Sequence, residues 1–83
     1  WYMAELKIAS EYFLKEIEIF RELNDKKNLA AGLNNLGNIY IKLGNYEKSL
    51  NYYLASLRIK EELQDKIEIA IALTGLGNFF WKR

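Results

Sequence analysis

Few side chains in this sequence of 83 residues are of types that do covalent chemistry. It contains no His and no Cys, so the commonest general base, metal ligand and strong nucleophile of proteins are missing. Two carboxylate pairs, Glu16 with Glu18 and Glu61 with Glu62, are too close along a helix to face each other. We interpret them as solvated surface groups. The sequence therefore predicts a protein that is not an enzyme and has no metal or cofactor.

Composition and pattern disfavour three further classes of ligand: bound phosphate, nucleic acid and membranes. Gly75 and Gly77 do not indicate a phosphate loop, because no strand is expected before them and no third glycine completes the motif. The net charge of +1, from 12 basic and 11 acidic residues, is too balanced for a dedicated nucleic-acid binder. No apolar run approaches the length of a membrane-spanning helix. We expect no nucleic-acid partner and no membrane partner.

Length and composition indicate one small domain covering residues 1–83. Hydrophobic residues make up 51% of the chain, enough for a packed core. The absence of Cys favours a reducing compartment, and the start, "WYMAELK", lacks the basic and apolar regions of a signal peptide. We therefore predict a cytoplasmic location.

An internal repeat in the sequence defines the structural unit that positions the polar side chains. Shifting the sequence by 40 residues places "LNNLGNIYIK" on "LTGLGNFFWK". Identical pairs include Tyr12/Tyr52, Leu14/Leu54, Ile19/Ile59, Leu23/Leu63, Asp25/Asp65, Lys26/Lys66, Ala30/Ala70, Leu33/Leu73, Leu36/Leu76, Gly37/Gly77, Asn38/Asn78 and Lys42/Lys82. The chain is two copies of one unit, approximately residues 4–43 and 44–83.

Four helices are predicted, at roughly 4–23, 27–43, 46–63 and 67–82. Apolar residues recur at helical spacing in each segment, and the turns contain Asn24-Asp25, Gly44-Asn45 and Gln64-Asp65. Gly44 suits a helix C-terminus, and Asp65 suits an N-cap, as Asp25 does one unit earlier. Connections this short make consecutive helices antiparallel, which predicts an all-α fold.

Side chains on the third helix form two apolar stripes, one through Tyr46, Leu50, Tyr53 and Leu57 and the other through Ser49, Tyr52, Ser56, Ile59 and Leu63. Both stripes must be buried, so this helix needs neighbours on two sides. We interpret the aromatic set Tyr12, Phe13, Tyr52 and Tyr53 as core. Gly37 and Gly77 each cost about 1 kcal/mol in mid-helix, which indicates close approach of a packed helix.

These residues resemble the tetratricopeptide repeat. Its first helix, A, is matched by Leu33-x-x-Leu36-Gly37-x-x-Tyr40 and by Leu73-x-x-Leu76-Gly77-x-x-Phe80. Its second helix, B, has a small residue and an aromatic four positions later, as in Ser49 and Tyr53. The period of 40, against about 34 in the family, resembles the forty-residue subclass with Leu-Gly-Asn repeats. The resemblance implies antiparallel helix hairpins stacked as a right-handed solenoid.

The helix order that this resemblance gives is B-A-B-A, because the chain begins with a helix of the second type. We therefore expect a fragment of a longer array, whose first and last helices lack a hairpin partner. Apolar side chains exposed at such ends mark contact sites. The alternative function is thus a structural building block that self-associates head-to-tail as a homo-oligomer, through Trp1, Phe79, Phe80 and Trp81.

The main function implied by the resemblance is binding of a protein or peptide partner on the concave face of the A helices. Asn amides can bond a peptide backbone as donors and as acceptors, and Lys side chains can meet acidic groups. The residues expected to line this groove are Asn34, Asn35, Asn38, Ile41, Lys42, Thr74, Asn78, Trp81 and Lys82.

Overall fold

Four α-helices make up the chain: α1 (Tyr2–Glu22), α2 (Lys26–Lys42), α3 (Tyr46–Glu62) and α4 (Lys66–Lys82). The computed structural model describes residues 2–82, apart from the side chains of Phe79 and Lys82. No strand occurs within residues 2–82, so the predicted all-α fold is confirmed. Each helix begins and ends within two residues of its predicted bounds.

Side chains in the turns fix where the helices begin. Asp25 and Asn45 each accept a hydrogen bond from the backbone N–H three residues on, at 3.3 and 3.2 Å. Asp65 does the same for α4, at 3.2 Å. Each bond satisfies one of the backbone donors that a helix leaves unpaired at its start. The N-caps predicted at Asp25 and Asp65 are therefore confirmed, and Asn45 is a further N-cap.

The helices end through residues in the left-handed backbone region. Gly44, after α2, has a φ of +81°, and Asn24 and Gln64, after α1 and α3, both have a φ of 55°. Glycine takes this conformation without steric cost and Asn tolerates it, whereas most other residues with a Cβ are strained in it. The turn at Gln64 therefore stores strain that the Gly44 turn avoids.

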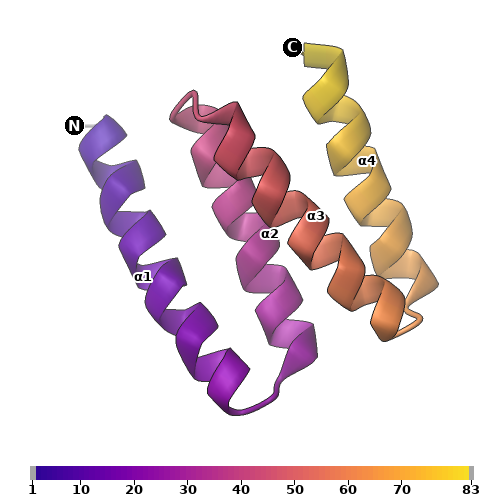
Figure 1. The fold of residues 1–83 in the computed structure, drawn as a ribbon. Helices are drawn as coiled ribbons and strands as arrows, with labels where there is room; N and C mark the ends of the chain where they lie inside the picture. Colours follow the sequence, from indigo (N-terminus) through magenta and orange to yellow (C-terminus); the bar gives the residue numbers. More distant parts are fainter. Residues whose placement is uncertain (1, 83) are drawn as a thin grey trace.

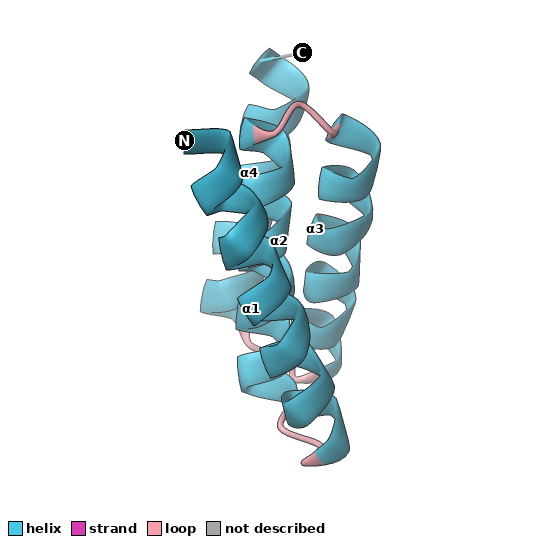
Figure 2. Cartoon of the chain, turned by 90° about the vertical axis from the view of Figure 1, so that its left-hand side faces the viewer, coloured by secondary structure: helices cyan, strands magenta, loops and turns pink. Residues whose placement is uncertain are grey.

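The helices lie side by side, with α1 and α4 at opposite edges of the molecule (Figure 1). α2 packs against α1 and α3, and α3 also packs against α4. In the view turned by 90°, α3 stands to one side of α2 and α4 (Figure 2). The result is a slab with principal extents of 38 × 32 × 17 Å, in which α2 and α3 form the central hairpin.

The larger core lies between α1, α2 and α3. Its buried members are Ile17 of α1 and Leu29, Leu33 and Leu36 of α2. Partly buried side chains surround them, namely Phe13, Phe20, Tyr40, Tyr52, Ala55 and Ile59. The rings of Tyr40 and Tyr52 stack with their centroids 5.5 Å apart and their planes 7° apart. This core uses the α3 stripe that contains Tyr52 and Ile59.

A smaller core joins α2, α3 and α4. Tyr53 and Leu76 are buried in it, with Ile41, Leu50 and Leu57 packed around them. This core uses the other stripe of α3, so the prediction that α3 has neighbours on two sides is confirmed. The stripes are covered only in their middle, since Tyr46 and Leu63 at their ends are exposed.

The prediction that four aromatic residues belong to the core is wrong for Tyr12. Tyr53 is buried, and Phe13 and Tyr52 are partly buried, but the side chain of Tyr12 is 62% exposed. Tyr12 has the register on α1 that Tyr52 has on α3. Tyr52 is partly covered because it packs into the larger core and its ring stacks on that of Tyr40. Tyr12 has no such cover, because among the described residues α1 packs chiefly against α2.

None of the helices within residues 2–82 combines the length and the apolar character needed to cross a lipid bilayer.

Candidate functional site

Close contact between α2 and α3 sets the geometry of the site. A Cβ added to Gly37 would lie 2.6 Å from Cδ1 and Cε1 of the Tyr53 ring, far inside the normal contact distance of about 3.5–4.0 Å. Glycine therefore allows the Tyr53 ring to lie directly on the α2 backbone. The prediction that a mid-helix glycine permits close approach of a packed helix is confirmed for Gly37. It is wrong for Gly77, where an added Cβ has no atom within 4 Å.

Two serines of α3 complete this close contact. The Ser49 hydroxyl donates to the carbonyl oxygen of Gly37 and the Ser56 hydroxyl to that of Ala30, each at 2.7 Å. Both serines have no exposed surface. A buried hydroxyl is tolerated when it is hydrogen-bonded, so these small polar residues hold the two helices together and fix their register.

Tyr53 also positions the side chain of Asn38. Its hydroxyl donates a hydrogen bond to the Asn38 amide oxygen Oδ1. Burial raises the pKa of Tyr53, against a smaller opposing effect of a hydrogen bond with Ser49, so the hydroxyl stays protonated as a donor. We expected the Asn38 amide to act toward a peptide backbone both as a donor and as an acceptor. Because its oxygen already accepts from Tyr53 within the protein, its amide N–H groups are what remain for a ligand.

An open groove lies where α2, the start of α3 and the middle of α4 meet. Its volume is about 370 Å³, and its lining residues are Asn38, Ile41, Lys42, Tyr46, Tyr53, Gly75 and Asn78. We call this the α2–α4 groove. It combines two amides and one ammonium group with apolar and aromatic surface, the mixture typical of sites that bind by hydrogen bonds and burial.

The structure brings together four of the residues predicted for the groove. Asn38, Ile41 and Lys42 line it from α2, and Asn78 lines it from α4. Asn38 and Asn78 are equivalent residues of the two repeats. The repeat thus places the same amide on both sides of one groove, which the spacing of 40 residues alone does not require.

The other predicted groove residues do not line it. Asn34 is partly buried and Asn35 is exposed, both on α2, and neither is among the lining residues. The Thr74 hydroxyl donates to the carbonyl oxygen of Ala70 at 3.0 Å, as Thr often does within a helix. Trp81 is 87% exposed and also lies outside the groove. The side chain of Lys82 lies outside the described residues.

Sequence reasoning missed Tyr46, Tyr53 and Gly75 as lining residues. Tyr46 and Tyr53 belong to the apolar stripe that faces α4, so their place between α2 and α4 could have indicated the groove. Gly75 carries no signal by itself. It has no atom within 4 Å of an added Cβ, so its lack of a side chain widens the groove.

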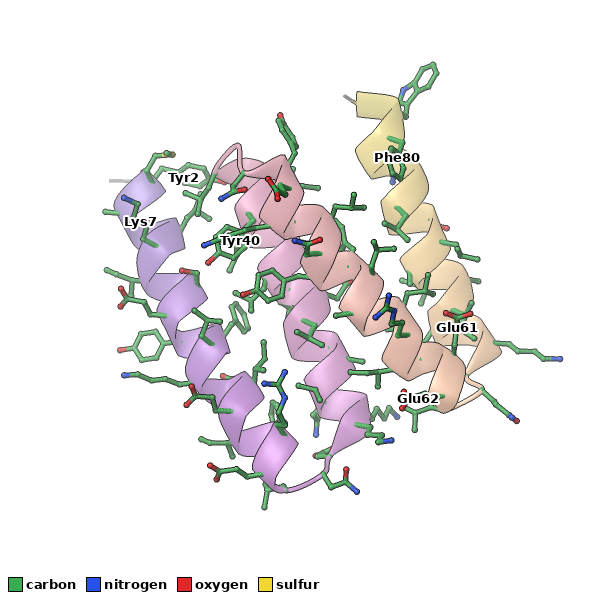
Figure 3. The ribbon with its side chains drawn as sticks, viewed as in Figure 1. Tyr2, Lys7, Tyr40, Glu61, Glu62 and Phe80 are labelled. Carbon is green, nitrogen blue, oxygen red and sulfur yellow. The ribbon has the colours of Figure 1, made fainter. Side chains whose placement is uncertain are left out.

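Two of the four side chains predicted for self-association, those of Phe80 and Trp81, lie among the described residues. Phe80 and Trp81 are exposed on α4, and Phe80 lies near its end at the edge of the molecule (Figure 3). Trp1 and the side chain of Phe79 lie outside the described residues. The expected exposure of apolar side chains at the last helix is therefore seen for Phe80 and Trp81.

A second, smaller hollow lies at the opposite end of α3. It has a volume of about 110 Å³ and is lined by Lys27, Asn28, Ala30, Ala31, Lys60, Leu63, Asp65 and Glu68. Lys60 is only 5% exposed, and its Nζ lies 3.6 Å from a Glu68 carboxylate oxygen. At the equivalent place in the first repeat stands Phe20. The second repeat therefore has a buried lysine, paired with a partly exposed glutamate, where the first has an aromatic residue.

No group of three or more acidic, His or Cys side chains within residues 2–82 could hold a metal ion. Glu62 pairs with Lys26 at 3.0 Å on the exposed surface, where such pairs contribute little. The chemistry that the α2–α4 groove offers is therefore recognition through amides, a positive charge and apolar contact.

The sequence matches a protein-family model. The family model described as tetratricopeptide repeat matches residues 1–62 and, in a second register, residues 28–83. Together the two matches span the chain. No curated protein matches it.

Proposed function

This chain belongs to the tetratricopeptide repeat family, and we propose that it binds a peptide segment of a partner protein in the α2–α4 groove. Members of the family generally mediate protein–protein interaction and are typically not enzymes. The observation that carries the proposal is the convergence of Asn38, Ile41, Lys42 and Asn78 on one groove. The specific forty-residue Leu-Gly-Asn subclass and the cytoplasmic location stay predictions.

The mechanism is non-covalent capture. Because Tyr53 occupies the amide oxygen of Asn38, that side chain presents N–H donors, which suit the carbonyl oxygens of a peptide backbone. Lys42 adds a positive charge, which suits an acidic side chain or a terminal carboxylate. Ile41 supplies apolar surface beside them, so a peptide with an acidic residue next to an apolar one fits best.

The test is selection of binders from a random peptide library displayed on phage, with the wild-type chain as bait. Binding of the selected peptides should fall at least about 10-fold in Asn78→Ala and in Lys42→Glu, the range expected for a lost hydrogen bond or charge pair. Asn35→Ala is the matched control, because Asn35 is exposed on α2 outside the groove.

Asn38→Ala is less suitable as a first variant, because it also removes the hydrogen bond to Tyr53 and would change stability. Thermal unfolding of each variant separates loss of binding from loss of fold. If selected peptides bind Asn78→Ala and Lys42→Glu as tightly as wild type, the groove is not the binding site and the proposal fails.

A head-to-tail building block is the second candidate function. Apolar side chains exposed at both edges favour it, including Ile8 and Ile19 on α1 and Ile71 and Phe80 on α4. It requires α1 of one copy to pack on α4 of the next. Light scattering over a concentration series tests it, since a mass that grows with concentration would support assembly and a constant monomer mass would exclude it.

A further inference from the structure

One apolar stripe of α3 ends in a lysine. The stripe runs through Tyr46, Leu50, Tyr53 and Leu57, and the next residue in this helical register is Lys60. Tyr53 and Lys60 are each 5% exposed, so the lysine is buried on the same face of α3 as the tyrosine. The equivalent residue of the first repeat is Phe20, which shows that an apolar side chain also suits this position of the unit.

The ammonium group of Lys60 is only partly compensated by its neighbours. Its Nζ lies 3.6 Å from a carboxylate oxygen of Glu68, beyond the roughly 2.7–2.9 Å of a charged hydrogen bond. The Glu68 side chain is 41% exposed, so water competes for its carboxylate. Because a buried charge is stable only when it is paired and hydrogen-bonded, the N–H donors of Lys60 have capacity for a closer acceptor.

The smaller hollow beside this lysine has room for such an acceptor. We call it the Lys60 hollow. Its volume of about 110 Å³ is far more than the roughly 10–15 Å³ that one water needs. Lys27 adds a second positive charge to its lining from α2. The Asp65 carboxylate is already engaged, because it accepts a hydrogen bond from the Glu68 backbone N–H at 3.2 Å.

The Lys60 hollow and the α2–α4 groove follow one another along the same pair of helices. Both are lined by residues of α2 and α4, with buried Lys60 of α3 in one and buried Tyr53 of α3 in the other. These two residues are seven positions apart, about two helical turns, so their side chains point the same way. α3 stands to one side of α2 and α4 (Figure 2). One extended ligand could therefore reach both cavities.

We propose that the Lys60 hollow binds the side-chain carboxylate of an aspartate or glutamate of the partner peptide, as a second anchor beside the α2–α4 groove. This inference rests on the proposed function and names the chemistry of a further site for the same ligand. In the bound state the carboxylate accepts hydrogen bonds from Lys60 Nζ. The partly exposed Glu68 side chain turns toward solvent, and Lys27 adds attraction at the edge of the hollow.

The positions of the two sites along α2 give the spacing of the anchors. Ala31 lines the Lys60 hollow and Lys42 lines the groove. At about 1.5 Å per residue they are about 16 Å apart along the helix, which an extended chain spans in about five residues at about 3.3 Å each. The partner peptide should therefore carry two acidic residues about four to six positions apart.

The first test uses N-acetyl-glutamate N-methylamide, a blocked glutamate residue, titrated into the ¹⁵N-labelled full chain at constant ionic strength. Amide resonances of Ala31, Lys60 and Glu68 should shift with a Kd of about 5–100 mM, the range of one charged hydrogen bond. Blocked glutamine should not bind. Absence of saturable shifts up to about 300 mM, or equal shifts with blocked glutamine, would overturn the proposal. Equally tight binding of inorganic phosphate would make the hollow a site for free anions and overturn the assignment to a side chain.

Two variants of the hollow should change this affinity in opposite directions. Lys60→Met keeps the apolar part of the side chain and removes the ammonium group, so blocked glutamate should bind at least about 10-fold more weakly. Glu68→Gln removes the competing carboxylate, so it should bind at least about 3-fold more tightly. Lys66→Met is the matched control, because Lys66 is exposed on α4 and lines neither cavity. If Lys60→Met binds as tightly as wild type, with circular dichroism showing an intact fold, the proposal is wrong.

Peptides selected on the wild-type chain separate this inference from the groove proposal. Their binding should fall at least about 10-fold in Lys60→Met and stay unchanged in Lys66→Met. If Lys42→Glu and Asn78→Ala weaken it but Lys60→Met does not, the groove is the binding site and the second anchor is refuted. If blocked glutamate binds the hollow while Lys42→Glu and Asn78→Ala change nothing, the carboxylate site stands and the groove proposal fails.

Discussion

Gly37 and Gly77 have the same neighbours in sequence, Leu-Gly-Asn in both cases, yet alanine should have opposite effects on stability at the two positions. Both lie within helices, so both substitutions gain about 1 kcal/mol of helix propensity. Only Gly37 faces a packed helix. A Cβ there would lie 2.6 Å from two ring carbons of Tyr53 and 3.0 Å from a third.

Relieving that overlap requires Tyr53 to move by about 1 Å to reach normal contact distance. The ring is buried between α2 and α4 and its hydroxyl is bonded to Asn38, so it cannot rotate out of the way. Overpacking of this kind costs about 1–3 kcal/mol. We expect Gly37→Ala to be neutral to about 2 kcal/mol destabilising, and Gly77→Ala to be about 1 kcal/mol stabilising.

The difference in unfolding free energy between Gly37→Ala and Gly77→Ala measures the packing effect alone, because the gain in helix propensity is the same in both and cancels. It should be about 1–3 kcal/mol. For a domain of this size each kcal/mol shifts Tm by about 4–8 °C. Thermal unfolding followed by circular dichroism, with urea unfolding as an independent measure of the free energy, is therefore sensitive enough.

Gly75→Ala serves as a control for the end of α4, since it also meets nothing within 4 Å and should behave like Gly77→Ala. Equal gains in stability for Gly37→Ala and Gly77→Ala would refute the reasoning. That result would mean that α2 and α3 are not in the close contact on which the position of Tyr53 depends.

Three further predictions follow from the packing of α3 and its turns. Lys60→Met should be neutral to about 2 kcal/mol stabilising, because one ion pair with a partly exposed glutamate seldom outweighs the cost of desolvating a buried ammonium group. Glu68→Gln should destabilise by about 1 kcal/mol by leaving Lys60 without its acidic partner. Urea unfolding measures both, and loss of stability in Lys60→Met would contradict the argument. Stability should fall as pH rises above 10.0, the ordinary pKa of tyrosine. The reason is that burial raises the native pKa of Tyr53, so the folded state holds this proton to a higher pH than the unfolded state. Urea unfolding across this pH range should show a weaker fall in stability for Tyr53→Phe, and an identical fall would argue against the raised pKa. Gln64→Gly should stabilise by about 0.5–1 kcal/mol by removing a side chain from a residue with a φ of 55°; a lower Tm would show that the turn is not strained.

The fold could be predicted from sequence to a large extent because its signals are local. Apolar spacing gave the helices, Asp25 and Asp65 gave two of their starts, and Gly44 gave an end. These signals act over a few residues, and the repeat presents each of them twice. The absence of His and Cys likewise needed only the composition to direct attention from catalysis to binding.

The candidate site could be predicted only in part, because lining a groove depends on neighbours distant in sequence. Asn34, Asn35 and Asn38 are close on one helix, but only Asn38 has the direction that meets α4 and Tyr53. Lys60 gave no sign of burial, because its type and its neighbours Glu61 and Glu62 are those of a solvated surface.

What the sequence by itself determined is the repeated unit: its helices, its caps and the residue types that each helix presents. What only the tertiary structure decided is which face of each helix is buried and which residues line a groove. Gly37 and Gly77 are the same residue in the same motif, but one lies beneath a tyrosine ring and the other is open. The physical reason is that the role of a helix face depends on the helix packed against it. Among the described residues α3 packs over Gly37 of α2, whereas no atom lies within 4 Å of an added Cβ at Gly77 of α4.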